Sequence, residues 1–112
     1  MKKDIDFNYL KQQVDTEIKN RGLDSIFYVL FDEKKRLPWA FHLFYRDGKF
    51  MINSRDDRSY VIGNTVEFTN FDEAKKDFIY TLEKYVEVNI QGKALGFQPD
   101  YPSPLWNSYI EK

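Results

Sequence analysis

His42 is the one histidine of this chain, and the chain has no cysteine. A histidine that acts as a general base needs a positioned partner and a substrate, and one imidazole without thiolates is too few for a zinc site of His and Cys ligands. The residues around it follow the pattern of a β-strand, so His42 is predicted to lie on the surface of a sheet. The alternative is an isolated base assisted by a carboxylate.

A set of carboxylates is the second group with chemical potential, because paired carboxylates serve glycosidases and clusters of them bind divalent cations. Two of them stand in a polar turn between arginines, and the others stand where a helix begins and negative charge is favoured. A solvated turn and a helix N-terminus explain these positions, so no catalytic residue and no metal site are predicted. The carboxylates considered are Asp56, Asp57, Asp72, Glu73 and Asp77.

Other motifs that carry chemistry are missing from the sequence, which has no Gly-rich phosphate loop and no G-x-S-x-G nucleophile turn. Three neighbouring basic residues, Lys34, Lys35 and Arg36, indicate a solvated loop, with an electrostatic contact to an acidic partner as the alternative. We therefore expect a protein that is not an enzyme and that uses no cofactor.

The composition predicts a single domain over residues 1–112, because 42% hydrophobic and 18% aromatic residues are enough for a core. A net charge of −1 gives no general attraction to nucleic acid. No run of ~18 apolar residues is present, and no apolar stretch follows the basic N-terminus, so neither a membrane span nor a signal peptide is predicted. We expect a cytoplasmic protein without membrane or nucleic-acid partners.

The first predicted element is an amphipathic helix over about residues 6–21. Asp4 or Asp6 can cap its start, and Gly22 can end it in the left-handed conformation. Its apolar residues recur at spacings of three and four and therefore share one face. They are Phe7, Leu10, Val14 and Ile18.

Four strands are predicted next, over residues 26–31, 39–45, 49–54 and 60–68. The pair Asp47-Gly48 favours a two-residue type I′ hairpin turn, in which both residues have positive φ. A bulge is expected at Gly63-Asn64. The hairpin turn also sets the register of the second and third strands. The predicted pairs are Arg46 with Lys49, Tyr45 with Phe50, Leu43 with Ile52, and Phe41 with Ser54.

A second helix is predicted from Asn70, which can cap it, to about residue 91, and short connections favour an antiparallel meander of the four strands. Each helix has one apolar stripe, so both are expected to cover the same face of the sheet in an α+β fold. Part of the opposite face would then be available for binding. It would be drawn from His42, Phe44, Met51, Asn53, Val61, Thr65 and Glu67.

The stretch from residue 97 to 112 combines prolines with large apolar side chains. Proline fixes φ and biases the residue before it toward extended conformations, and large apolar side chains gain most when they are buried. We expect a stiff C-terminal arm that docks on the domain, with Tyr101, Leu105 and Trp106 as anchors. A contact with a partner or with a second copy is the alternative for this arm.

The chain resembles the immunity protein 59 family of bacterial polymorphic toxin systems. The resemblance rests on the N-terminal helix and on the stretches Phe44-Tyr45-Arg46-Asp47-Gly48-Lys49-Phe50, Phe68-Thr69-Asn70-Phe71-Asp72-Glu73-Ala74 and Tyr101-Pro102-Ser103-Pro104-Leu105-Trp106. It implies a protein that binds and neutralises a cognate toxin domain and so protects the producing cell. It supplies no catalytic residues.

An acidic surface is our hypothesis for the toxin contact, because nuclease toxin domains are commonly basic and carboxylates can mimic a phosphate backbone. Its members would be Asp56, Asp57, Glu67, Asp72, Glu73 and Asp77. Two other functions stay open. One is an interaction module without a toxin partner, and the other is a small ligand-binding domain with His42 and two convergent carboxylates in a pocket. A monomer and a homodimer are both compatible with the sequence.

Overall fold

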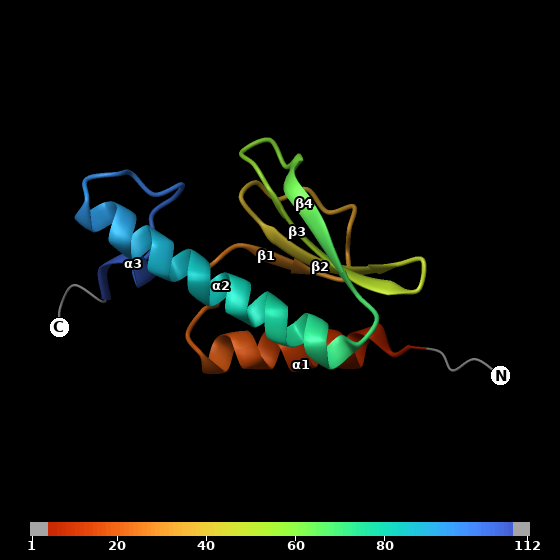
Figure 1. Cartoon of the computed structure of the whole chain (residues 1–112). Coiled ribbons are helices and arrows are strands. Elements are labelled where there is room, and N and C mark those ends of the chain that lie inside the picture. Colours follow the sequence, from red (N-terminus) through yellow and green to blue (C-terminus); the bar gives the residue numbers. More distant parts are fainter. Residues whose placement is uncertain (1–4, 109–112) are drawn as a thin grey trace.

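The computed structural model describes residues 5–108, and the side chains of residues 5–106. Two long helices and a four-stranded sheet make up most of this part of the chain, in an α+β fold (Figure 1). Within the described residues, none of the helices has the length and apolar character needed to cross a membrane. The elements are α1 (Phe7–Asn20), β1 (Tyr28–Leu30), β2 (Phe41–Arg46), β3 (Lys49–Arg55), β4 (Val61–Phe68), α2 (Phe71–Ala94) and α3 (Leu105–Ser108).

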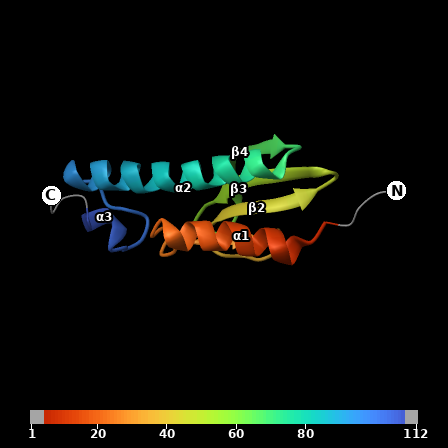
Figure 2. The ribbon, with the colours of Figure 1, turned by 90° about the horizontal axis from the view of Figure 1, so that it is seen from below.

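Both long helices lie on the same face of the sheet, side by side, as Figure 2 shows from below. Val14 and Ile18 of α1 and Phe78 and Leu82 of α2 are fully buried, and they pack in one cluster with Leu43 of the sheet. The spacing of these residues places them on one side of each helix. The expectation that the helices share a face is therefore confirmed.

Both helix starts follow the predicted capping chemistry. The Asp6 carboxylate accepts a hydrogen bond from the Tyr9 backbone N–H at 3.2 Å, whereas Asp4 lies outside the described residues. The Asn70 side chain accepts from the Glu73 N–H at 3.1 Å. These side-chain oxygens satisfy donors that the first helical turn leaves without partners. The second helix continues to Ala94, a little beyond the predicted end.

The β2–β3 hairpin has the predicted turn and register. Asp47 and Gly48 have φ values of 54° and 80°, as a type I′ turn requires. The four predicted pairs are present, and β4 carries the expected irregularity, since the register shifts between Ile52 and Ser54 and Gly63 has a φ of 70°. Local turn chemistry was enough to predict this part of the sheet.

Replacing Gly48 with alanine is expected to lower the free energy of unfolding by about 1–2 kcal/mol, because a Cβ atom is strained at positive φ. Urea unfolding would measure the loss. Gly92 is the matched control, because it lies within α2 and a Cβ built there meets only an ordinary contact at 3.8 Å. Its alanine variant should be as stable as the unmodified protein or slightly more so. An equal loss in both variants would contradict the role of the turn.

The predicted antiparallel meander is wrong at its first connection. The strand order is β1-β2-β3-β4, but β1 pairs with β2 in parallel, so the sheet is mixed. A parallel pair requires the chain to cross over and return to the same end of the sheet. Residues 31–40 are long enough for this return because β1 has only three residues. This segment is therefore not one of the short connections that a meander requires.

The expectation that part of the face opposite the helices is available holds at β4, where Val61, Thr65 and Glu67 are exposed, but it is wrong for the centre of this face, where the residues are buried. His42 is 0% exposed and Phe44 3% exposed, and Met51 and Asn53 are buried as well. Segment 31–40 explains the burial, since the Arg55 side chain on this face donates to the Glu33 carbonyl of that segment at 3.3 Å. The returning crossover thus covers the face that a meander would have left open.

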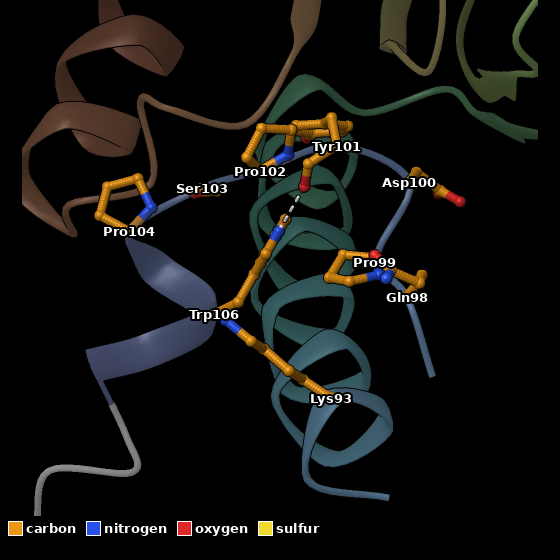
Figure 3. A pocket seen from close by; sticks show the side chains of 9 residues that line it. All are labelled: Lys93, Gln98, Pro99, Asp100, Tyr101, Pro102, Ser103, Pro104 and Trp106. Atoms are coloured by element: carbon orange, nitrogen blue, oxygen red, sulfur yellow. Dashed lines mark hydrogen bonds between the residues drawn. The ribbon is translucent and has the colours of Figure 1, made fainter. Parts of the chain in front are cut away.

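The C-terminal segment packs against α2 and the start of β1. Trp106 is 1% exposed and belongs to the core cluster, and its Nε1 donates to the Tyr101 carbonyl at 2.7 Å (Figure 3). The Tyr101 ring stacks on Phe27 at 4.2 Å between centroids, and its hydroxyl accepts from the Phe27 N–H at 3.3 Å. Ser103 bonds Ser25 through their hydroxyls at 3.1 Å. Within the described residues, the segment turns into the short helix α3 after Pro104 instead of remaining extended.

Candidate interaction surface

His42 is not placed for acid–base catalysis. Its ring is fully buried, and neither ring nitrogen has a hydrogen-bond partner among the described residues. Burial and, to a smaller extent, the positive charge of Arg55 together lower the pKa of His42 from 6.5 to about 4, with the charge of Asp32 acting in the opposite direction. The imidazole is therefore neutral at neutral pH and acts as a core side chain. It does not lie on the sheet surface where we expected it.

No carboxylate cluster gathers for metal binding in the described part of the chain, where no three His, Cys, Asp or Glu side chains are close enough to hold an ion. A hollow lies beside the C-terminal segment, and its lining includes Pro99, Pro102 and Pro104 (Figure 3). The charged residues of this lining are Lys93 and Asp100. The Asp100 carboxylate accepts from the Tyr85 hydroxyl at 2.8 Å, so it already has a structural partner.

β4 is the most exposed element of the sheet. It is an edge strand with seven of its eight residues exposed. Val61 is 47% exposed and lies, with its pair Arg55, on the face of the sheet that the crossover 31–40 covers. Ile62 and Val66 are 45% and 44% exposed and lie on the face that the two long helices cover. Tyr60, which precedes the strand, is 58% exposed. Apolar side chains are thus presented on both faces of one strand, which makes β4 the candidate interaction surface of the sheet.

The other edge of the sheet is different. Its strand β1 has three residues, and the backbone N–H of Phe27 just before it is bonded to Tyr101. Short and covered edges do not pair with other chains. Among the described strands, β4 therefore offers the larger accessible edge, although its bulge at Gly63 interrupts the row of backbone groups.

The structure divides the predicted acidic surface into two parts. Asp56 and Asp57 lie in the turn before β4, whereas Glu67 lies at the far end of that strand. Asp72, Glu73 and Asp77 follow in the first turns of α2 (Figure 1). The eight residues of β4 span roughly 25 Å. The six carboxylates therefore do not form one patch, and only the last four lie at the same end of the strand.

The individual carboxylates also differ in their contacts. Asp56 accepts from the backbone N–H groups of Arg58 and Tyr60 at 2.8 and 3.0 Å, and these bonds hold its pKa below the usual range. Asp56 therefore has a structural role in the turn. Glu67 forms a salt bridge with Lys49 at 3.1 Å, and Asp72 and Glu73 are exposed at the start of α2.

Arginine side chains near the start of β4 were not part of the predicted surface. Arg36 of the crossover lies over the Tyr60 ring, with its guanidinium carbon 5.7 Å from the ring centroid. Arg55 donates to the Ser59 carbonyl at 3.1 Å and so ties the same turn to β3. In the sequence, the run of basic residues from Lys34 to Arg36 indicated a basic contact surface as the alternative to a solvated loop. The position of Arg36 beside Tyr60 depends on the path of the crossover.

The predicted structural anchors lie at two places in the fold. Gly48 occupies the β2–β3 turn, far along the chain from the other three. Trp106 is in the core, and Tyr101 and Leu105 are partly buried against it. None of these residues contributes to the exposed strip along β4.

Comparison with known proteins gives a match to one family model. The model described as Immunity protein 59 matches residues 7–107, which include both long helices and all four strands. No curated protein and no solved structure matches the chain.

Proposed function

The chain belongs to the immunity protein 59 family, and from this membership we propose that it binds a cognate toxin domain and neutralises it in the cytoplasm of the bacterium that produces both. The observation that supports a binding role is the exposed strip along β4, which combines Tyr60 with Val61, Ile62 and Val66. Exposed aromatic and aliphatic side chains on a rigid strand lose little entropy when they are covered by a partner.

We place the acidic part of the toxin contact at the end of β4 that leads into α2. Glu67, Asp72, Glu73 and Asp77 lie there within a short stretch of chain, and the partial positive charge at the N-terminus of α2 offsets only part of their negative charge. Such a group attracts a basic surface and raises the rate of association. Asp56 and Asp57 are left out of this contact because they lie at the other end of β4.

Co-expression with the toxin domain encoded beside its gene tests the proposal. We expect the two proteins to purify together in a stable complex and the cells to grow, whereas a toxin domain from an unrelated system should neither bind nor be neutralised. A toxin that stays free and lethal in the presence of this protein would overturn the proposal and favour an interaction module with another partner.

Neutralising three carboxylates by Glu67→Gln, Asp72→Asn and Glu73→Gln is expected to weaken toxin binding severalfold, mainly by slowing association. The association rate of the variant should also depend less on salt. Stopped-flow or surface-binding kinetics would measure both effects. Glu87→Gln is the control, because Glu87 is an exposed carboxylate of α2 outside this group. Equal rates for the triple variant and the control would remove the acidic end from the contact.

A further inference from the structure

The arginines of this chain fall into two groups. Arg21 bonds Glu17 at 2.6 Å and Glu83 at 2.7 Å, and Arg46 bonds Glu33 at 2.6 Å. Arg36, Arg55 and Arg58 differ, since none of them has a carboxylate within salt-bridge distance among residues 5–106. All three lie near the turn where β4 begins.

These three residues belong to the two segments that meet at Tyr60. Arg36 stacks on the Tyr60 ring, Arg58 precedes Tyr60 by two residues, and Arg55 is bonded to the carbonyl of the residue just before it. Arg55 is partly buried, and burial together with the positive charge of Arg36 lowers its pKa. Three guanidinium groups therefore lie at this end of the sheet, interspersed with the carboxylates of the same two segments.

The carboxylates of Glu33 and Asp56 are already engaged, whereas Asp32 and Asp57 are exposed and form no salt bridge with a described residue. Glu33 belongs to the same crossover, but its carboxylate bonds Arg46. Asp56 belongs to the same turn, but its carboxylate accepts from two backbone N–H groups. Asp57 is the remaining exposed carboxylate of the turn. Arg36 and Arg58 are thus exposed donors whose bidentate geometry suits a carboxylate from outside the chain.

The backbone beneath these side chains is held by several contacts. Trp39 and Ser59 have φ values of 65° and 69°, which residues other than glycine adopt only where the surrounding structure holds them. Both donate their backbone N–H to the Asp56 carbonyl, at 3.0 Å each. The crossover and the turn are therefore joined at one residue, and a partner that binds here orders little additional chain.

We infer that Arg36, Arg58 and Tyr60 form a second contact with the toxin domain, in which the two guanidinium groups bind carboxylates of an acidic loop on the toxin and the Tyr60 ring packs against its apolar part. The inference rests on the proposed function. Arginine and tyrosine are the side chains most enriched at the energetic centres of interfaces. With acidic residues at one end of β4 and arginines at the other, roughly 25 Å apart, the strip would bind a toxin in one orientation only.

The test is a double charge reversal, Arg36→Glu with Arg58→Glu, measured as affinity for the co-purified toxin domain. We expect at least a tenfold loss of affinity. The matched control is Lys34→Glu with Lys35→Glu, which changes the net charge equally on the same exposed crossover. Its loss should be several times smaller. Arg55 is left unchanged because it holds the turn, and the urea unfolding midpoints of both double variants should match that of the unmodified protein.

The outcomes separate this inference from the proposed function. If the unmodified protein fails to bind the toxin, the proposed function itself fails. If it binds and the Arg36→Glu, Arg58→Glu variant binds equally well, the inference alone is wrong. Equal losses in the arginine and lysine variants would also overturn it, because they would show a general charge effect. The inference would also be overturned if the arginines bound a phosphate-rich oligonucleotide and this oligonucleotide did not compete with the toxin.

Discussion

Replacing Trp106 with alanine is expected to lower the free energy of unfolding by about 3–5 kcal/mol, the usual cost of removing a large aromatic side chain from a core. Trp106 is 1% exposed, its ring meets Tyr85 edge to face at 5.6 Å, and its Nε1 donates to the Tyr101 carbonyl. Small proteins have a total stability of about 5–15 kcal/mol. The variant should therefore unfold at a much lower urea concentration or be partly unfolded without urea.

The control for this prediction is Phe97→Ala, a change of a large aromatic residue in the same part of the chain. Phe97 is 69% exposed, so its loss should change the stability by no more than about 0.5 kcal/mol. Trp106→Phe should fall between the two, because it keeps most of the buried area but loses the hydrogen bond. If Trp106→Ala unfolds at the same urea concentration as Phe97→Ala, the C-terminal segment does not belong to the folded core.

Acid is expected to destabilise the protein through His42. The unfolded chain binds a proton on this imidazole near pH 6.5, but the folded protein binds it only near pH 4, because the ring is buried. The contribution of neutral His42 is fully present above pH 6.5. As the pH falls from 6.5 to 4, the unfolded state binds the proton before the folded state does. The free energy of unfolding therefore drops by about 3 kcal/mol.

The measurement is urea unfolding of the unmodified protein and of His42→Leu at pH values between 8 and 4. Leucine fills a similar volume and does not titrate, and no hydrogen bond to a described residue is lost with the ring. Carboxylates that titrate in the same window affect both proteins equally. As the pH falls, the free energy of unfolding of the unmodified protein should therefore decrease more than that of His42→Leu. Parallel pH profiles would show that His42 is not buried as described.

Local rules predicted the parts of this fold that depend on neighbouring residues. Asp47 and Gly48 determined the β2–β3 turn and with it the register, because a two-residue turn allows few backbone conformations. Asp6 and Asn70 marked the helix starts because a cap needs only a side chain and the next turn. In each case the determining contacts lie within a few residues.

The direction of β1 was not predictable in this way. Tyr28, Val29 and Leu30 have the same β-branched and aromatic pattern in a parallel strand as in an antiparallel one. The path of residues 31–40 decides between the two, and this path depends on tertiary contacts such as the bond from Arg55 to the Glu33 carbonyl. The burial of His42 follows from that path, so it could not be read from the strand's own residues.

The candidate surface was predictable in its residue types but not in its arrangement. Asp56 and Glu67 are both acidic residues near β4, but the length of the strand separates them, and hydrogen bonds within the turn occupy Asp56. Arg36 is distant from Tyr60 along the chain, and only the crossover brings the two side chains together. A surface built from separate segments requires the fold to be known first.

The contact of the C-terminal segment with the start of β1 has a consequence for the kinetics of folding. Tyr101 and Phe27 are 74 residues apart in the chain, and Ser103 and Ser25 are 78 apart. Closing a loop of this length costs conformational entropy before the contact returns any energy. Such long-range pairings slow folding at a given stability. The β2–β3 hairpin should therefore form early after dilution from denaturant, and the stacking of Tyr101 on Phe27 should be among the last native contacts to appear.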